Sequence, residues 1–161
     1  MDNQPQINID YRHDGLAKRL SNLFPREFTF DGVECRSMEG LLQSFKIQDE
    51  SKQKEFCRLY GMRAKMAGKG IPWWEDQTLW WKGEPYYRQS NEYQDLLMDA
   101  YAHLFARNKD AHQDLIDSHP ARLIHLVGHT NPTETILTRN EFCSILMNIR
   151  TVLLQIKMVE F

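Results

Sequence analysis

Three polar side chains recur at helical spacing in the stretch SMEGLLQSFK, residues 37–46. At 100° per residue, Glu39, Gln43 and Lys46 share one face, while the apolar residues of the stretch share another. A well-held carboxylate could act as a general acid or base, or could stabilise positive charge that develops on a sugar ring. An exposed helix face would carry the same residues, and the helix dipole alone favours Glu39 in the first turn.

Lys46 is the residue of this face whose chemistry depends most on its surroundings. At the surface it would extend its apolar stem and keep its charge in water. Buried beside Glu39, it would contact a phosphate or act as an amine nucleophile toward a sugar aldehyde, with Gln43 orienting one of the two. Gly40 costs about 1 kcal/mol relative to alanine in this first turn, and it indicates that a ligand or a backbone segment comes close there.

A second group of candidate residues lies in an aromatic-rich segment, residues 70–90, which holds all four tryptophans. Trp80 or Trp81 could stack on a planar base, as aromatic side chains do in nucleotide sites. They could instead anchor a long loop to the helices, or form a docking surface for a partner. Arg63 and Lys65 could meet a phosphate, although a solvated helix face explains them equally well.

Composition narrows the class of protein. The 161 residues are 42% hydrophobic with a formal net charge of −2, which predicts one domain with its own core and argues against a general binder of nucleic acid or anionic membranes. The three cysteines are widely spaced, and no Cys/His pattern suits zinc. With no secretion signal and no apolar run approaching 18 residues, we expect free thiols, no metal and a cytoplasmic location.

The elements that must position these residues are predominantly helical. Residues 28–35 (FTFDGVEC) predict a β hairpin, because Asp31-Gly32 suits a type I′ turn. Ser37 is a suitable N-cap for the helix that follows. Further helices are predicted at 52–68 after a break near residue 50, at 93–105, at 111–118 behind an Asp110 cap, and after a Thr138/Glu141 capping box.

The remaining segments predict little regular structure. Residues 1 to about 15 predict a flexible start followed by a short strand, and residues 121–127 (ARLIHLV) a buried strand or extended segment. The aromatic segment is expected to be a long connection, and residues 128–135 (GHTNPTET) a loop. The chain, 1–161, is therefore predicted to be a single domain of the mainly α (α+β) class, with a small N-terminal β hairpin.

Residues 20–46 (LSNLFPREFTFDGVECRSMEGLLQSFK) resemble the signature of the NADAR, or YbiA-like, family. That family begins with a Phe- or Leu-Ser-Asn-Phe stretch ahead of a hairpin, followed by an S-x-E-H-x-x-Q-x-x-K helix. Here the first part is matched by Leu20, Ser21, Asn22 and Phe24, and the second by Ser37, Glu39, Gln43 and Lys46. The AYAHLF helix and the final N-x-x-x-x-x-L-M-x-x-R pattern (Asn140, Leu146, Met147, Arg150) are also similar to the family.

The resemblance implies a compact, mainly helical YbiA-like fold and N-glycosidase chemistry, the hydrolysis of a bond between a ribose carbon and a nitrogen. The implied substrates are phosphorylated ribosylaminopyrimidine intermediates of riboflavin synthesis and ADP-ribose attached to guanine bases, and no cofactor is implied. Glu39 would be the family glutamate, and Lys46 the lysine linked to the opened ribose. The residues expected to bind substrate are Ser21, Asn22, Phe24, Gln43, Arg63, Lys65, Trp80, Trp81, His129 and Asn140.

Three positions depart from the family pattern. The histidine after the family glutamate is Gly40 here, a glutamate common in the strand near the C-terminus is His125, and a W-G stretch is replaced by residues 128–131. Either the substrate differs from the best-known ones, or His129, Asn131 and the tryptophan segment rebuild part of the pocket. A protein that binds an ADP-ribose-like or cyclic nucleotide ligand without cleaving it is the alternative function.

Overall fold

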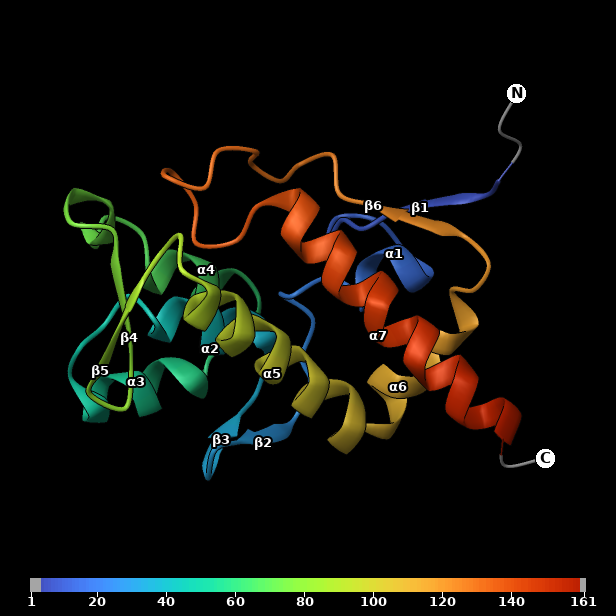
Figure 1. Cartoon of the computed structure of the whole chain (residues 1–161), viewed down its shortest axis with the longest axis horizontal. Helices are drawn as coiled ribbons and strands as arrows, with labels where there is room; N and C mark the ends of the chain where they lie inside the picture. The colour runs from blue at the N-terminus through green and yellow to red at the C-terminus, as the bar shows by residue number, and fades with distance from the viewer. Residues whose placement is uncertain (1–3, 160–161) are drawn as a thin grey trace.

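The computed structural model describes residues 4–159, in which helices predominate over three small two-stranded sheets (Figure 1). The helices are α1 (Gly15–Arg19), α2 (Met38–Ser44), α3 (Glu50–Cys57), α4 (Gly61–Ala67), α5 (Asn91–Arg107), α6 (Lys109–Asp117) and α7 (Arg139–Val159). The strands are β1 (Gln6–Asn8), β2 (Phe28–Phe30), β3 (Val33–Cys35), β4 (Thr78–Trp81), β5 (Glu84–Tyr87) and β6 (Arg122–Ile124). The predicted mainly α (α+β) class is confirmed.

The N-terminal hairpin forms where the sequence predicts it. β2 and β3 pair antiparallel with Phe30 opposite Val33. Asp31 and Gly32 adopt positive φ angles of 48° and 77°, as a type I′ turn requires. The alternating burial of the two strands turns their aromatic and aliphatic side chains toward the core.

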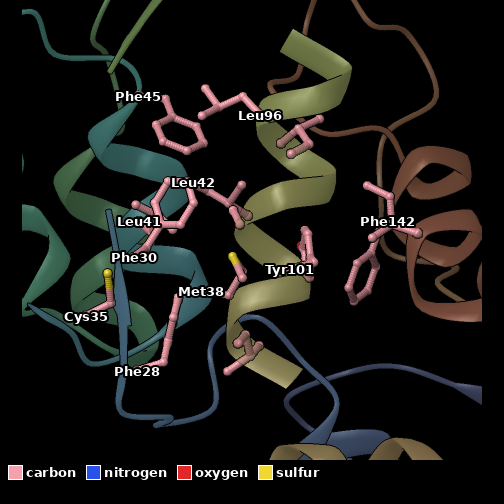
Figure 2. Packing of buried hydrophobic residues seen from close by; sticks show 14 of the residues in the cluster. Phe28, Phe30, Cys35, Met38, Leu41, Leu42, Phe45, Leu96, Tyr101 and Phe142 are labelled. Carbon is pink, nitrogen blue, oxygen red and sulfur yellow. The ribbon is translucent and has the colours of Figure 1, made fainter. Parts of the chain in front are cut away.

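Helix α2 begins at its predicted cap and is buried along its whole length. The Ser37 hydroxyl accepts a hydrogen bond from the Gly40 backbone N–H at 3.0 Å. All seven residues of α2 are buried, so its polar face does not meet bulk solvent. Its apolar side chains and those of the hairpin gather against α5, while Phe142 of α7 lies on the other side of α5 (Figure 2).

The helix predicted at 52–68 is two helices, and the break before it falls earlier than predicted. The chain leaves α2 after Phe45, and Asp49 caps α3 by accepting from the Lys52 backbone N–H. The second helix, α4, starts at Gly61, whose φ of +61° interrupts the helical path. A similar shift occurs at α6, where Asn108 rather than Asp110 provides the cap, accepting from the Ala111 N–H at 2.9 Å.

The aromatic segment was predicted to be a long irregular connection, and this prediction is wrong. The segment contains a short 3₁₀ turn (Trp73–Glu75) and a second antiparallel hairpin, β4–β5. Its two-residue turn is Lys82-Gly83, with φ angles of 48° and 81°. Trp81 packs against Phe30 at 5.3 Å and Phe45 at 5.7 Å between ring centroids. This tryptophan therefore fastens the second hairpin to the core.

The predicted strands near the two ends of the chain pair with each other. β1 and β6 run parallel, with Ile7 opposite Leu123. They lie at the end of the molecule away from the β4–β5 hairpin (Figure 1). Residues 1–3 of the predicted flexible start lie outside the described part of the chain.

Helix α7 opens with the predicted capping box, since Thr138 and Glu141 exchange hydrogen bonds of 2.7 and 3.1 Å between side chains and backbone N–H groups. By length and composition alone α7 could cross a membrane, with a mean hydropathy of 1.4, but core helices of globular proteins meet the same criterion. Its first half packs in the core, whereas Val152 and Ile156 are about half exposed. Cys35 and Cys57 are buried, Cys143 is half-buried, and all three are free thiols.

Candidate functional site

A cavity of about 750 Å³ opens beside the polar face of α2. Its walls come from residues 10–12 and 21–23, from α2 and α4, and from the segment that runs from β6 to the start of α7. The predicted site residues that line it are Ser21, Asn22, Glu39, Gln43, Lys46, Lys65 and His129. The polar stripe of α2 therefore faces a cavity and not bulk solvent.

Glu39 is a buried acid of this cavity, with 9% of its surface exposed. Its Oε1 accepts a hydrogen bond from the Gln43 amide at 2.9 Å, and its backbone N–H donates to the Asn22 carbonyl at 2.9 Å. Burial raises the pKa of Glu39, and the Gln43 bond and the nearby ammonium groups of Lys46 and Lys65 offset this only in part. Such a carboxyl is suited to proton transfer or to stabilising a cation.

The C-terminal end of α4 holds Gln43 and Lys46 in position. Lys46 Nζ donates to the Gly68 carbonyl at 3.2 Å, and burial lowers the pKa of this lysine while Glu39 raises it. A Cβ atom at Gly68 would lie 1.7 Å from Gln43 Oε1, so only glycine leaves room for the amide as it stands. Among residues 4–159, Gln43 Oε1 has no hydrogen-bond partner.

Gly40 does not open space for a ligand. A Cβ atom here would lie 2.6 Å from the Phe56 carbonyl oxygen and 2.8 Å from that of Leu59. The sequence left open whether a ligand or a backbone segment comes close to Gly40. The structure shows a backbone segment, at the end of α3 and just after it. A family-like histidine would need α3 to move away from α2.

Ser21 and Asn22 line the cavity with side chains that also support the local backbone. The Asn22 Oδ1 accepts from the buried Tyr101 hydroxyl at 2.8 Å, and Ser21 Oγ accepts from the Leu23 N–H at 3.2 Å. Lys65 of α4 and Lys69 of the turn that follows this helix lie at the cavity wall. Their exposed ammonium groups are therefore placed to meet an anionic part of a ligand.

Five residues predicted to bind substrate do not line the cavity: Phe24, Arg63, Trp80, Trp81 and Asn140. Trp81 is buried in the core and donates to Asp31 at 3.0 Å, and the Trp80 backbone N–H pairs with the Phe45 carbonyl. Arg63 and Asn140 are exposed outside the cavity. Phe24 lies under the Arg26 guanidinium, and exposed Asn131 binds the Thr133 backbone N–H in its own loop.

Trp73 and His125 line the cavity, although the sequence did not select them as site residues. His125 Nδ1 lies 2.7 Å from the Ile9 carbonyl oxygen, which can only accept, so Nδ1 carries the hydrogen and Nε2 is the acceptor of the neutral ring. Burial lowers the pKa of His125, with Lys65 and Arg139 acting in the same direction and Asp10 opposing them. His125 could have been found from the sequence because it replaces a glutamate common in the family. For Trp73 the sequence offers only its place in the aromatic-rich segment.

Asp10 is the second buried acid of the cavity wall. It is 3% exposed, and Arg12 binds both its oxygens, at 3.0 Å and 2.7 Å. These bonds hold the pKa of Asp10 well below its usual range. Its carboxylate is therefore committed to the arginine, unlike that of Glu39.

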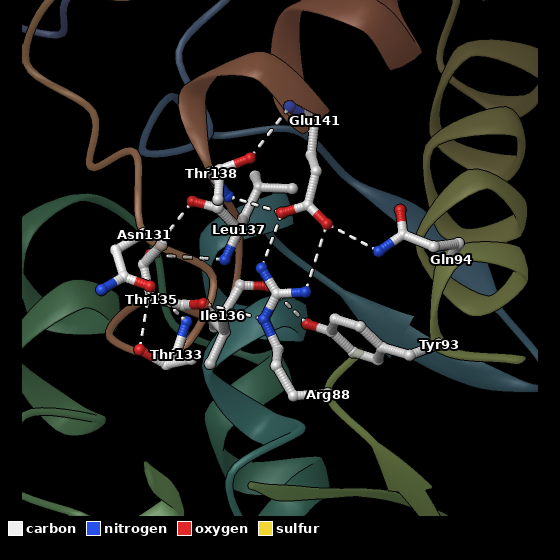
Figure 3. A network of polar contacts seen from close by, with 10 residues as sticks. All are labelled: Arg88, Tyr93, Gln94, Asn131, Thr133, Thr135, Ile136, Leu137, Thr138 and Glu141. Carbon is white, nitrogen blue, oxygen red and sulfur yellow. Dashed lines mark hydrogen bonds and ion pairs between the residues drawn. The ribbon is translucent and has the colours of Figure 1, made fainter. Parts of the chain in front are cut away.

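The far wall of the cavity is fixed by a buried ion pair (Figure 3). Arg88, at 1% exposed, binds Glu141 through 2.6 Å and 3.1 Å contacts and donates to the Thr135 carbonyl at 2.8 Å. The Tyr93 hydroxyl donates to the Ile136 carbonyl at 2.7 Å. Because residues 134–138 line the cavity, this network sets its width.

No group of three or more His, Cys, Asp and Glu side chains within residues 4–159 is placed to hold a metal ion. The cavity is lined by ammonium, amide, hydroxyl and aromatic groups, by several aliphatic side chains, and by the carboxyls of Asp10, Glu39 and Glu134. Metal-independent chemistry stays a prediction.

The architecture is that of YbiA. The NMR structure of the E. coli protein YbiA matches 99% of this chain and 94% of its own length with a TM-score of 0.60, at 17% sequence identity. The predicted YbiA-like fold is confirmed.

The chain belongs to the family described as Bacteriophage protein GP30.3, whose model matches residues 15–151. A relative from Enterobacteria phage T4, described as an uncharacterized 17.1 kDa protein in the Gp30-rIII intergenic region, is 32% identical over 147 residues. That match covers 90% of this chain and 95% of the phage T4 protein.

Proposed function

We propose that this chain is an N-glycosidase, which hydrolyses the bond between ribose and a base or amine in a nucleotide-like substrate. The observation that carries the proposal is Glu39, a buried carboxyl on the wall of a 750 Å³ cavity in a YbiA-like fold. Substrates related to ADP-ribose or to phosphorylated riboflavin precursors fit the proposal, and ADP-ribosylated guanine in nucleic acid is one candidate.

In the proposed reaction the bond between ribose C1 and nitrogen breaks, and its electron pair stays on the nitrogen. The ring is left with oxocarbenium character, which the ionised Glu39 stabilises while Gln43 holds the carboxylate through its N–H. Water then adds to C1 and gives a proton to Nε2 of His125. His125 passes this proton on to the leaving nitrogen, so the imidazole ends neutral and the sum is substrate plus water giving the ribose hydroxyl and the free base or amine. Atoms and charge balance without a cofactor.

Other cavity residues have binding roles in this proposal. Lys46 contacts the anomeric end of the ribose, Trp73 offers an aromatic surface to the base, and Lys65 and Lys69 meet phosphate. Trp73 takes the stacking role that the sequence gave to Trp80 or Trp81, because neither of those tryptophans lines the cavity.

The test is mass spectrometry of products after the protein is mixed with NAD, ADP-ribosyl guanine and ribosylaminopyrimidine phosphates. We expect one of these compounds to release its free base or amine with wild-type protein, and not with Glu39→Gln. If Glu39→Gln releases the product at the wild-type rate, the assignment of Glu39 is wrong.

A sequestering protein is the second candidate, and the state of the other acids in the cavity favours it. Asp10 is bound by Arg12, and Glu134 lies exposed on a loop, which leaves Glu39 as the one buried cavity acid outside an ion pair within residues 4–159. Tight binding of an ADP-ribose-like or cyclic nucleotide ligand, recovered unchanged after the protein is denatured, would establish this function instead.

A further inference from the structure

Arg150 is buried without a carboxylate partner. The residue is 4% exposed, and its guanidinium binds Ser118 Oγ at 2.9 Å and Met147 Sδ at 3.2 Å. No other hydrogen bond or ion pair to it occurs within residues 4–159. Buried arginines in proteins are normally paired with an anion, because an uncompensated charge is costly to remove from water.

Arg150 lines a second cavity, of about 620 Å³, which shares no residue with the cavity of Glu39. It lies between the second half of α7 and the His119–Pro120 turn. Leu154 and Met158 form an apolar wall, and Lys157 adds a second positive charge at the rim. No acidic side chain within residues 4–159 lines this groove.

Two of the five guanidinium N–H groups of Arg150 are used inside the protein, so three remain for a ligand. A carboxylate accepts two parallel N–H bonds from this fork and supplies the single negative charge that the buried cation lacks. The apolar wall lies one and two helical turns further along α7, at Leu154 and Met158, and suits a hydrocarbon body beside that charge.

We propose that this groove binds a small amphiphilic carboxylate, with its acid group on Arg150 and its hydrocarbon part along Leu154 and Met158. The argument is independent of the proposed N-glycosidase function, because no residue of the Glu39 cavity takes part.

The proposal is tested by titrating the full chain with octanoate and, separately, with octanol, following backbone amide NMR signals of α7. Octanoate should bind at least roughly tenfold more tightly than octanol, since a hydrogen bond to a charged group contributes that much or more. Octyl phosphate serves as a third ligand, and we expect it to bind more weakly than octanoate. Equal binding of octanoate and octanol would overturn the proposal.

Two substitutions sharpen the experiment. Arg150→Met should abolish the preference for octanoate, but it could also unfold the chain. Leu154→Glu is therefore the decisive variant, because it places a carboxylate four residues from Arg150 in the same groove, where it should occupy the guanidinium and block octanoate. Val152→Glu adds the same charge outside the groove and should leave binding unchanged. If Leu154→Glu binds octanoate as the wild type does, the site is wrong.

Discussion

At the scale of single residues, the proposed chemical role of Glu39 comes with a cost to the stability of the fold. Its pKa is higher in the folded protein than in the unfolded chain, because burial disfavours the carboxylate. Between these two pKa values the folded state holds a proton that the unfolded state has lost, so the free energy of unfolding falls as pH rises. The full cost is present at pH values above the raised pKa of Glu39.

Glu39→Gln should therefore raise Tm at pH 7 and lower the hydrolysis rate by about 10² to 10³. The gain in Tm should shrink as the pH approaches 4.5, where the native carboxyl is protonated and resembles the amide. Calorimetry across this pH range measures the first effect and product release the second. Glu55→Gln, on the exposed face of α3, is the control and should change neither. A variant less stable than the wild type at pH 7 would contradict the argument.

Gln43 should tune the pH dependence of the reaction. Because the proposed reaction needs ionised Glu39, activity should rise with pH through the raised pKa of this carboxyl. Gln43→Ala removes the N–H donor that lowers that pKa, so the acidic limb of kcat/KM should move to higher pH. The titration of the Glu39 carboxyl carbon by ¹³C NMR measures the same shift without a substrate.

A matched control for Gln43→Ala is Gln113→Ala. Gln113 donates to Asp117 at 2.7 Å with the same spacing of four residues, but on the exposed face of α6 and outside the cavity. Gln113→Ala should therefore change neither the pH profile of kcat/KM nor the titration of the Glu39 carboxyl. An unchanged Glu39 titration in Gln43→Ala would mean that the hydrogen bond does not control this carboxyl.

At the scale of elements, the packing of α2 on α3 depends on Gly40. Gly40→Ala would place a methyl group 2.6 Å from the Phe56 carbonyl oxygen and force the two helices apart. We expect a loss of about 1–3 kcal/mol in the free energy of unfolding, measured by urea denaturation. Ser51→Ala, an exposed change on α3, should lie within about 0.5 kcal/mol of wild type. A Gly40→Ala protein as stable as the wild type would contradict this argument and would mean that the structure has room for a side chain at this position.

The elements that the sequence predicted are those specified by short-range signals. The turn residues Asp31 and Gly32 and the Thr138/Glu141 capping box act within four residues, and both form as predicted. Lys82-Gly83 is a weaker turn signal than Asp-Gly, so the second hairpin was missed. The predicted 52–68 helix is split at Gly61, where the φ angle is positive. The periodicity of apolar residues does not reveal such a change in backbone conformation.

In the candidate site too, the sequence predicted what depends on local spacing and did not predict what depends on contacts between distant segments. Glu39 and Gln43 lie on α2 and Lys46 in the turn directly after it, so their helical spacing predicted that they share one wall of the cavity. His125 enters through a hydrogen bond to Ile9, 116 residues earlier in the sequence, and no local pattern encodes that contact. The packing of Trp81 against Phe30 and Phe45 is also long-range, so the sequence around Trp81 does not reveal that this ring lies in the core.

At the scale of the whole molecule, the Arg88–Glu141 pair joins the region of the second hairpin to the start of α7. Arg88→Met leaves Glu141 half-buried without its partner, and breaking such a pair typically costs about 3–5 kcal/mol. We expect a loss of that size in urea denaturation, together with a weaker affinity for any ligand of the Glu39 cavity, because the Thr135 carbonyl loses its donor.

Asp99→Asn is the control for Arg88→Met, since its pairing with His103 is exposed and should contribute less than about 1 kcal/mol. Equal losses in the two variants would show that the buried network is no more important than a surface pair.

The parallel pairing of β1 with β6 also sets an order of events during synthesis. β1 leaves the ribosome early, but its partner follows about 116 residues later, a delay of roughly 6–23 s at 5–20 residues per second. Until then the Ile9 carbonyl oxygen lacks its hydrogen bond from His125, and the cavity wall at the start of α7 has not been synthesised. A nascent chain therefore carries the Glu39 helix well before it carries a closed cavity, and ligand capture has to wait for translation of the last helix.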